Sequence, residues 1–202
     1  MAGTGFWWIL AACAAYGVLH SILAAWGFKT LVARRIGQAA YNRFYRLFFS
    51  AAGAVTVLPL FALAALLPDR VLYTIPTPWR YLTLLVQALA ALTLLYAVMQ
   101  TGALRFVGIE QALRPGGSAG PEKLITTGLY RWVRHPLYTS GYLILWLVPV
   151  MTWNLLALNL GLSAYMWIGS IFEERKLAAQ FGPAYEDYRA RTPRIVPGIR
   201  RL

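Results

Sequence analysis

The residues best suited to chemistry stand in the run 128–138, where Arg134 and His135 lie among tyrosines and a tryptophan. Two adjacent acids, Glu173 and Glu174, follow after an apolar stretch without a charged residue. Charged side chains make up only 13% of the 202 residues, and they are costly beside lipid, so a cluster of them marks a candidate site. A cation, an imidazole and two carboxylates could bind a charged small molecule or move a proton.

The local sequence predicts how these groups are presented. Pro136 suits the first turn of a helix, and the backbone N–H groups at such a helix start favour an anion or a carboxylate. His135 and Tyr138 would share one face of that helix. The adjacent acids point in different directions, so we expect one to be ion-paired and the other to bind a ligand. The residues alone also allow a simpler reading, in which Arg134 binds a lipid phosphate and the aromatic side chains form an interfacial belt.

The composition indicates an integral membrane protein. The chain is 59% hydrophobic, whereas a soluble domain carries about 25% charged residues. The net charge of +12 comes from basic residues that lie between apolar segments. Nucleic-acid binding needs one continuous basic surface, so we expect none. Cys13 is the only cysteine and the two histidines lie on different elements, so no metal site is predicted.

Apolar segments long enough to cross a membrane predict an all-α protein with five transmembrane helices. Three spans are expected at 6–28, 47–67 and 81–102, the first of them a span and not a cleaved signal. The uncharged stretch 137–172 is too long for one span and is expected to fold as a tight helical hairpin with two short legs, which are spans four and five. Turn-prone residues at 149–154 mark its tip.

Basic residues gather in alternate connections, which predicts the orientation. They follow the first, third and fifth spans and are few elsewhere, so the N-terminus is expected outside and the C-terminus in the cytoplasm. The run 128–138 and the acidic pair would then face the cytoplasm from the two ends of one hairpin and share a pocket. We also expect a loop at 114–120, and a short helix within 177–191 that breaks at Gly182.

Several motifs in the C-terminal part resemble the isoprenylcysteine carboxyl methyltransferase and phospholipid methyltransferase superfamily. The motifs that keep the family's order and spacing lie at 124–130, 134–138, 173–174, 181–188 and 193–194. The N-terminal half, with His20-Ser21 and Tyr45-Arg46, looks more like the NnrU-type and methanethiol S-methyltransferase branch.

The resemblance implies an integral membrane enzyme that holds S-adenosylmethionine in a cytoplasmic pocket. It implies one domain, 1–202, with a three-helix part at 1–102 and a cofactor-binding part at 103–202. The residues that match the family's cofactor contacts, with Gln111 and Arg134 added as further candidates, are Leu124, Ile125, Tyr130, His135, Pro136, Leu137, Tyr138 and Glu173. One departure is Gly169, which stands where the prenylcysteine enzymes place an arginine, and it argues against a prenylcysteine carboxylate substrate.

The expected reaction is an in-line methyl transfer, in which the protein aligns donor and acceptor and excludes water. We expect His135 to orient the methionine part and Glu173 to bind its ammonium or the ribose hydroxyls. Glu174 and His20 are the candidate catalytic bases, although a histidine in a span more often hydrogen-bonds a neighbouring helix. A lipid amine, a small thiol and an isoprenoid-like carboxylate are all possible acceptors.

Two other functions fit parts of this pattern. One is an NADPH-dependent membrane reductase of the sterol-reductase kind, whose C-terminal region also resembles this superfamily. The other is a non-catalytic membrane protein, which would show no stabilisation by any cofactor. The sequence does not determine the acceptor or the oligomeric state.

Overall fold

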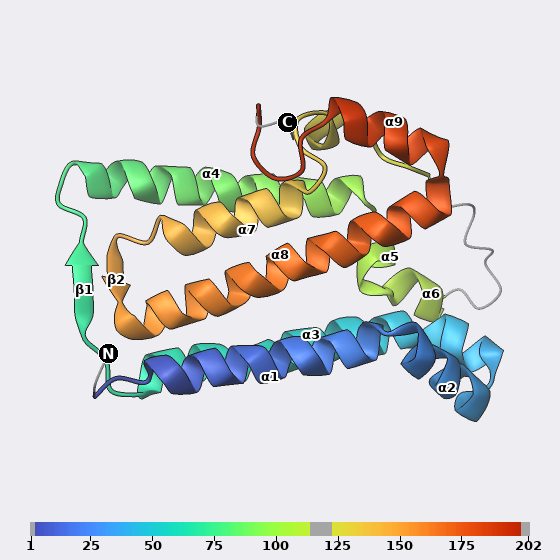
Figure 1. Ribbon diagram of the computed structural model, residues 1–202, viewed down its shortest axis with the longest axis horizontal. Helices are drawn as coiled ribbons and strands as arrows, with labels where there is room; N and C mark the ends of the chain where they lie inside the picture. The colour runs from blue at the N-terminus through green and yellow to red at the C-terminus, as the bar shows by residue number, and fades with distance from the viewer. Residues whose placement is uncertain (1–2, 114–122, 199–202) are drawn as a thin grey trace. The chain divides into compact units, whose positions relative to one another are not determined.

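The computed structural model of the protein describes residues 3–113 and 123–198, and most of them are helical (Figure 1). The loop expected at 114–120 lies outside these residues. The chain divides into two compact units. The first unit contains the described residues up to Leu72, those from Gly102 to Leu113, and Thr152–Gly161. The second unit contains the other described residues.

Four helices of the described chain are long and apolar enough to cross a membrane. They are α1 (Phe6–Ala24), α3 (Gln38–Leu66), α4 (Trp79–Gln100) and α8 (Trp153–Phe181). The three N-terminal spans are therefore found where they were expected, with shifted ends. The expected fourth span corresponds to α7 (Pro136–Trp146), which has only 11 residues.

The first unit contains α1, α2 (Trp26–Ile36), α3, α5 (Ala103–Val107), α6 (Ile109–Leu113) and the start of α8. Two corrections concern its spans. The first span ends at Ala24, because Ala25 is extended and a separate helix, α2, follows. The second span, α3, begins at Gln38, well before the apolar run. Within this early part, Arg43 and Arg46 donate to the carbonyls of Ala112 and Phe106.

Close packing in the first unit depends on small residues and one buried amide. Gly161 on α8 lies so near α1 that an added Cβ would be 2.5 Å from Cys13 Cβ. Gly108, at φ +98°, brings the turn between α5 and α6 against the backbone of α3. Asn154 is fully buried, and its Nδ2 donates to the carbonyls of Leu67 and Pro68, just beyond the end of α3. These contacts hold the ends of α3 and α8 together.

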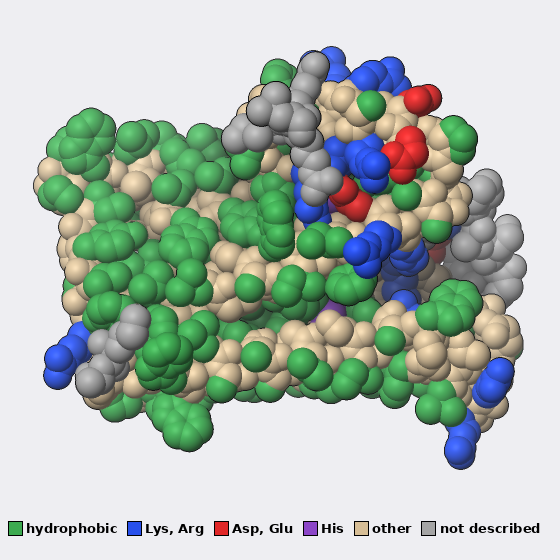
Figure 2. Space-filling model, viewed as in Figure 1, with side chains coloured by type: hydrophobic (Ala, Val, Ile, Leu, Met, Phe, Trp, Pro, Cys, Tyr) green, Lys and Arg blue, Asp and Glu red, His purple; other side chains and the backbone are tan. Residues whose placement is uncertain are grey.

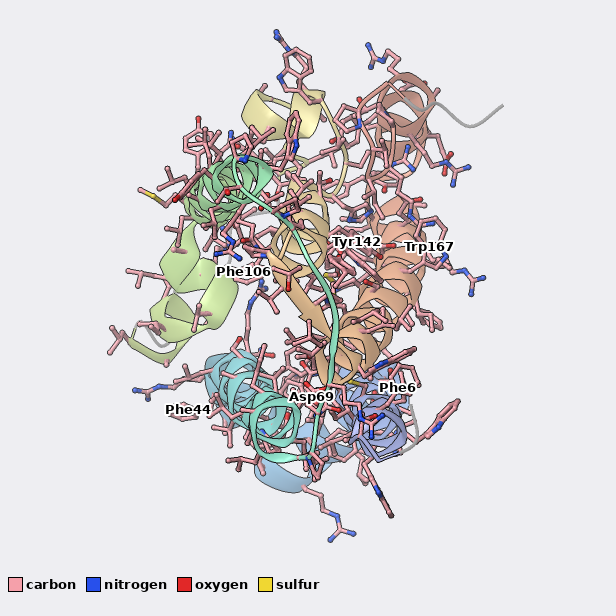
Figure 3. All side chains as sticks on the ribbon, turned by 90° about the vertical axis from the view of Figure 1, so that its left-hand side faces the viewer. Phe6, Phe44, Asp69, Phe106, Tyr142 and Trp167 are labelled. Atoms are coloured by element: carbon pink, nitrogen blue, oxygen red, sulfur yellow. The ribbon has the colours of Figure 1, made fainter. Side chains whose placement is uncertain are left out.

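The second unit contains α4, the short 3-10 helix η1 (Gly128–Arg131), α7, the rest of α8 and α9 (Pro183–Arg191). Polar bonds join its long helices: Gln87 Nε2 on α4 donates to the carbonyl of Ile144 at 2.7 Å. Tyr142 and Trp146 on α7 both donate to Ser163 on α8 at 2.9 Å. Figure 3 labels Tyr142 and, on α8, Trp167.

The expected helical hairpin is present, with unequal legs. A short strand, β2 (Val150–Thr152), forms its tip and pairs with β1 (Val71–Thr74) in a two-stranded sheet. Only the first leg, α7, is short; α8 has 29 residues and is not. The expected break at Gly182 is also present, because α8 ends at Phe181 and α9 starts at Pro183.

The helices expose apolar side chains, as helices that face lipid tails do. Leu58 on α3 and Leu92 on α4 are 62% and 63% exposed. On the second unit, Figure 2 shows hydrophobic side chains over α4 and α7 and a concentration of charged ones around α9. The candidate site lies among those charged side chains.

Candidate functional site

The run 128–138 consists of a 3-10 helix, a short irregular stretch and the start of α7. The helix η1 is entered at Gly128, whose φ of +61° suits glycine, and Leu129 N–H donates to Gln100 Oε1 on α4. The chain then extends to His135, the residue before α7, and Pro136 occupies the first turn as predicted. This places Arg134 and His135 at the end of α7 that faces the acidic pair on α8.

His135 lies between the two carboxylates. Its Nε2 atom is 3.2 Å from Glu174 Oε1, and its Nδ1 atom is 3.6 Å from Glu173 Oε2. The ring is buried at 4% exposure and stacks on Tyr138, whose hydroxyl donates to Glu173 Oε2 at 3.0 Å. The hairpin therefore brings together the two short segments that the sequence singled out.

The two glutamates have different surroundings. Glu174 is 12% exposed, and its Oε1 atom accepts from Arg134 Nε at 2.8 Å and lies 2.6 Å from Arg134 Nη2. Glu173 is 48% exposed, and among the described residues only its Oε2 atom has polar partners. The acidic pair does not end its helix, contrary to expectation, because α8 continues to Phe181. The unfavourable helix-dipole contact that a terminal position would bring is therefore absent.

Burial and hydrogen bonding act on the pKa of His135 in opposite directions. Burial lowers this pKa, but the hydrogen bonds to Glu173 and Glu174 and their negative charges raise it more, so the pKa is raised overall. Burial, with a smaller effect of the Glu173 charge, raises the pKa of Tyr130 to about 12. The site thus favours a protonated imidazole and a neutral phenol.

A third segment, which the sequence analysis did not include in the site, completes its frame. The backbone N–H groups of Arg134 and His135 donate to the carbonyls of Pro193 and Arg194 at 2.9 and 3.0 Å. Thr139 Oγ1 donates to the carbonyl of Ile195 at 2.6 Å. Because these amides are occupied, an anion at the start of α7 would have to use N–H groups further along the first turn. The Pro-Arg motif at 193–194 was the only sequence signal for this segment.

Arg194 anchors the third segment to α8. Its Nη2 atom donates to Ser170 Oγ at 2.6 Å, and its guanidinium lies 4.7 Å from the centre of the Trp167 ring. Its Nε atom is 3.8 Å from Glu174 Oε1. Arg194 thereby adds a second positive charge beside the more buried glutamate.

The other candidate site residues of the second unit lie within the run 128–138 or just before it. The carbonyl of Tyr130 accepts a hydrogen bond from the hydroxyl of Tyr188 on α9 at 2.6 Å. Leu124, Ile125 and Leu137 are partly buried. An open hollow of about 420 Å³ lies beside η1. Its lining residues are Tyr96, Thr126, Thr127, Gly128, Leu129, Arg131 and Trp132.

Two candidates, Gln111 and His20, belong to the first unit and are described with it. Gln111 Nε2 donates to the carbonyl of Arg105, and its Oε1 atom is buried without a partner among the described residues. The His20 ring stacks on Tyr16 and packs 4.3 Å, centre to centre, from Phe49 on α3. Neither is part of the cluster that the second unit builds.

The chain is similar to one known protein family and to several curated proteins. The model of the phospholipid methyltransferase family matches residues 80–184. Methanethiol S-methyltransferase 1 of Bradyrhizobium diazoefficiens is 29% identical over 192 residues, which is 94% of this chain and 66% of that protein. Methanethiol S-methyltransferase 2 of the same organism is 39% identical over 46% of this chain and 36% of its own length.

A third relative is the methanethiol S-methyltransferase of Mycobacterium tuberculosis, 39% identical over 34% of this chain and 28% of its own length. The match therefore spans 66% of the length of the first relative and about a third of the length of the other two. No solved structure matches the chain.

Proposed function

We propose, because the chain belongs to the phospholipid methyltransferase family, that it is an integral membrane methyltransferase that transfers a methyl group from S-adenosylmethionine to a small thiol. The observation that carries the proposal is the buried His135 between Glu173 and Glu174, in the segment that the family model matches. The names of the relatives favour a thiol over a lipid amine or a carboxylate.

We further propose the membrane arrangement. The four long helices cross the bilayer, α7 with the β2 tip forms a fifth, shorter crossing, and residues 1–202 act as one domain. The positive-inside rule supports an outer N-terminus and a cytoplasmic C-terminus. The cluster would then face the cytoplasm, where S-adenosylmethionine is made available to it.

The residues present fit the chemistry of this donor. Its ammonium and ribose hydroxyls need an acceptor, and Glu173 is a half-exposed carboxylate whose Oε1 atom is not engaged among the described residues. Its sulfonium is a cation, and aromatic side chains attract cations. When bound, S-adenosylmethionine supplies an electrophilic methyl group. The residues of the second unit proposed to hold it are Leu124, Ile125, Tyr130, His135, Pro136, Leu137, Tyr138 and Glu173. Gln111, in the first unit, stays a candidate on the sequence argument alone.

In this proposal the other charged groups of the cluster stabilise the frame of the site. Arg134 donates to Glu174 and to the carbonyls of Arg189 and Thr192, so we assign it to the frame of the site and not to direct contact with the cofactor. The guanidinium groups of Arg134 and Arg194 lie beside Glu174, and their positive charges stabilise its carboxylate form, which makes it poorly suited to accept the thiol proton. His20 stays a candidate base on the sequence argument alone.

The test has a binding step and a transfer step. Binding of S-adenosylmethionine to the detergent-solubilised protein is measured by calorimetry for the wild type, Glu173→Gln and His135→Ala. Loss of a hydrogen bond to a charged group predicts about tenfold to hundredfold weaker binding for Glu173→Gln. Glu186→Gln is the matched control, because Glu186 is also 48% exposed and, within the described part of the chain, its ion pair is with Arg189 on the surface of α9.

Transfer of a tritiated methyl group is then measured against a panel of small thiols and a membrane lipid extract. Methylation of a thiol is expected. A wild type that does not bind S-adenosylmethionine would refute the proposed function, whereas undiminished binding by both variants would refute the site. Stabilisation by NADPH and not by S-adenosylmethionine would favour the reductase alternative.

A further inference from the structure

One tyrosine of the second unit carries a buried hydroxyl that the described residues do not satisfy. Tyr185 on α9 is 0% exposed, and its hydroxyl oxygen has no hydrogen-bond partner among the residues described. Buried polar groups in native proteins are nearly always hydrogen-bonded, so each exception calls for an explanation. The neighbouring tyrosines do not share this property. Tyr138, Tyr142 and Tyr188 each donate to a carboxylate or a carbonyl of the same unit.

The face of α9 that carries Tyr185 is turned toward the candidate site. One turn further along this face, the Tyr188 hydroxyl donates to the carbonyl of Tyr130. The carbonyls of Arg189 and Thr192, also on this side, accept from Arg134 Nη1 at 3.0 and 2.6 Å. Tyr185 is therefore buried on the side of α9 that the site residues contact.

Burial and the nearby charges keep the Tyr185 hydroxyl protonated, and therefore able to donate. Burial, followed by the negative charge of Glu174, raises the pKa of Tyr185 to about 12, so the phenol stays protonated at every physiological pH. The nearby carboxylates are already hydrogen-bonded: Glu174 Oε1 by Arg134 and His135, and Glu173 Oε2 by Tyr138. The frame thus holds together without the Tyr185 hydroxyl.

We propose that Tyr185 is a cofactor-binding residue, whose hydroxyl donates a hydrogen bond to an acceptor atom of S-adenosylmethionine. This inference rests on the proposed function. It adds α9 to the segments proposed to contact the cofactor, and it assigns a role to a buried donor that has no partner among the described residues. The hydroxyl would be satisfied only in the ligand-bound protein, which gives the proposal a signature that a structural tyrosine would not share.

The test is Tyr185→Phe, with Tyr188→Phe as the matched control one turn along the same helix. Both variants lose one buried hydroxyl, but in the part of the chain that the structure describes only the Tyr188 hydroxyl has a partner. Two quantities are measured in detergent: the melting temperature without ligand, and the dissociation constant of S-adenosylhomocysteine by calorimetry. S-adenosylhomocysteine is the probe because it shares the donor's polar groups and cannot react.

We expect Tyr185→Phe to melt at or above the wild-type temperature without ligand and to bind S-adenosylhomocysteine about fivefold to tenfold more weakly, the effect of one neutral hydrogen bond. Tyr188→Phe is expected to melt lower than the wild type. A dissociation constant within about twofold of the wild-type value overturns the proposal. A lower melting temperature of ligand-free Tyr185→Phe also overturns it, because the hydroxyl would then be partnered without the cofactor.

The wild-type titration separates this inference from the proposed function. If the wild type does not bind S-adenosylhomocysteine, the methyltransferase proposal itself fails. If the wild type binds and Tyr185→Phe binds equally well, only the assignment of Tyr185 fails.

Discussion

Removal of the Arg134 guanidinium should be among the most destabilising single changes in the second unit. The side chains of Arg134 and Glu174 are only 7% and 12% exposed, and Arg134 also donates to the carbonyls of Arg189 and Thr192. Arg134→Met would leave the Glu174 carboxylate buried without its main counter-charge. Breaking one partner of a buried ion pair in this way costs about 3–5 kcal/mol.

This loss corresponds to a measurable fall in the melting temperature. In a domain of this size each kcal/mol shifts the midpoint by about 2–4 °C, so Arg134→Met should melt roughly 6–20 °C below the wild type. The assay is thermal unfolding of the detergent-solubilised protein, followed by the fluorescence of its tryptophans. Arg189→Met is the control, because the Arg189–Glu186 pair is half exposed and such pairs contribute about 0–1 kcal/mol.

A double variant tests the reason for the loss. If the penalty comes from an uncompensated buried charge, Arg134→Met combined with Glu174→Gln should be more stable than Arg134→Met alone. A fall of less than about 4 °C for Arg134→Met, or a double variant that is no better than the single one, would show that the pair does not hold this part of the fold.

Three further predictions concern pH and packing. Because the pKa of His135 is raised in the fold, the protonated imidazole should contribute fully to stability below its ordinary pKa of 6.5, and this contribution should be lost as the pH rises through the raised value. Melting temperatures measured between pH 5.5 and 9 should show this decline in the wild type and not in His135→Gln. Gly161→Ala should lower the melting temperature because the added Cβ would lie 2.5 Å from Cys13 Cβ. The control Gly27→Ala, in open space on α2, should raise the stability by about 0.5–1 kcal/mol. Equal effects of the two variants would contradict the close contact of α1 and α8. Asn154→Leu should cost about 1–3 kcal/mol, since the carbonyls beyond α3 lose a buried donor; unchanged unfolding of this variant would count against that role.

The apolar runs predicted where the long helices lie, but they predicted the helix ends less accurately. Hydropathy shows where a helix can meet lipid, but a helix continues as long as its backbone bonds are favourable. For this reason α3 begins at Gln38, among polar and basic residues, and α8 runs past the acidic pair to Phe181. The short first leg, α7, was predicted, whereas the long second leg, α8, was not. The strand β2 was also not predicted, because strand pairing with β1 has no clear signature in such short segments.

The approach of His135 to the acidic pair followed from chain connectivity. A hairpin without a charged residue must return its second end to the level of the first, and the structure has these groups within 3.2–3.6 Å. The role of Pro193–Ile195 in framing the site could not be inferred in the same way. Its contacts with Arg134 and His135 are made by backbone atoms, which every residue type possesses. The buried hydroxyl of Tyr185 likewise depends on how α9 is turned, which its side-chain pattern alone does not determine.

The backbone hydrogen bonds of Arg134 and His135 with Pro193 and Arg194 affect how the protein is made. These residues leave the ribosome after α8 has been synthesised, so the start of α7 lacks two of its hydrogen-bond partners while the helices enter the bilayer. The cluster would be assembled only after the four long helices have been synthesised. A nascent chain stalled before Pro193 would be inserted and inactive.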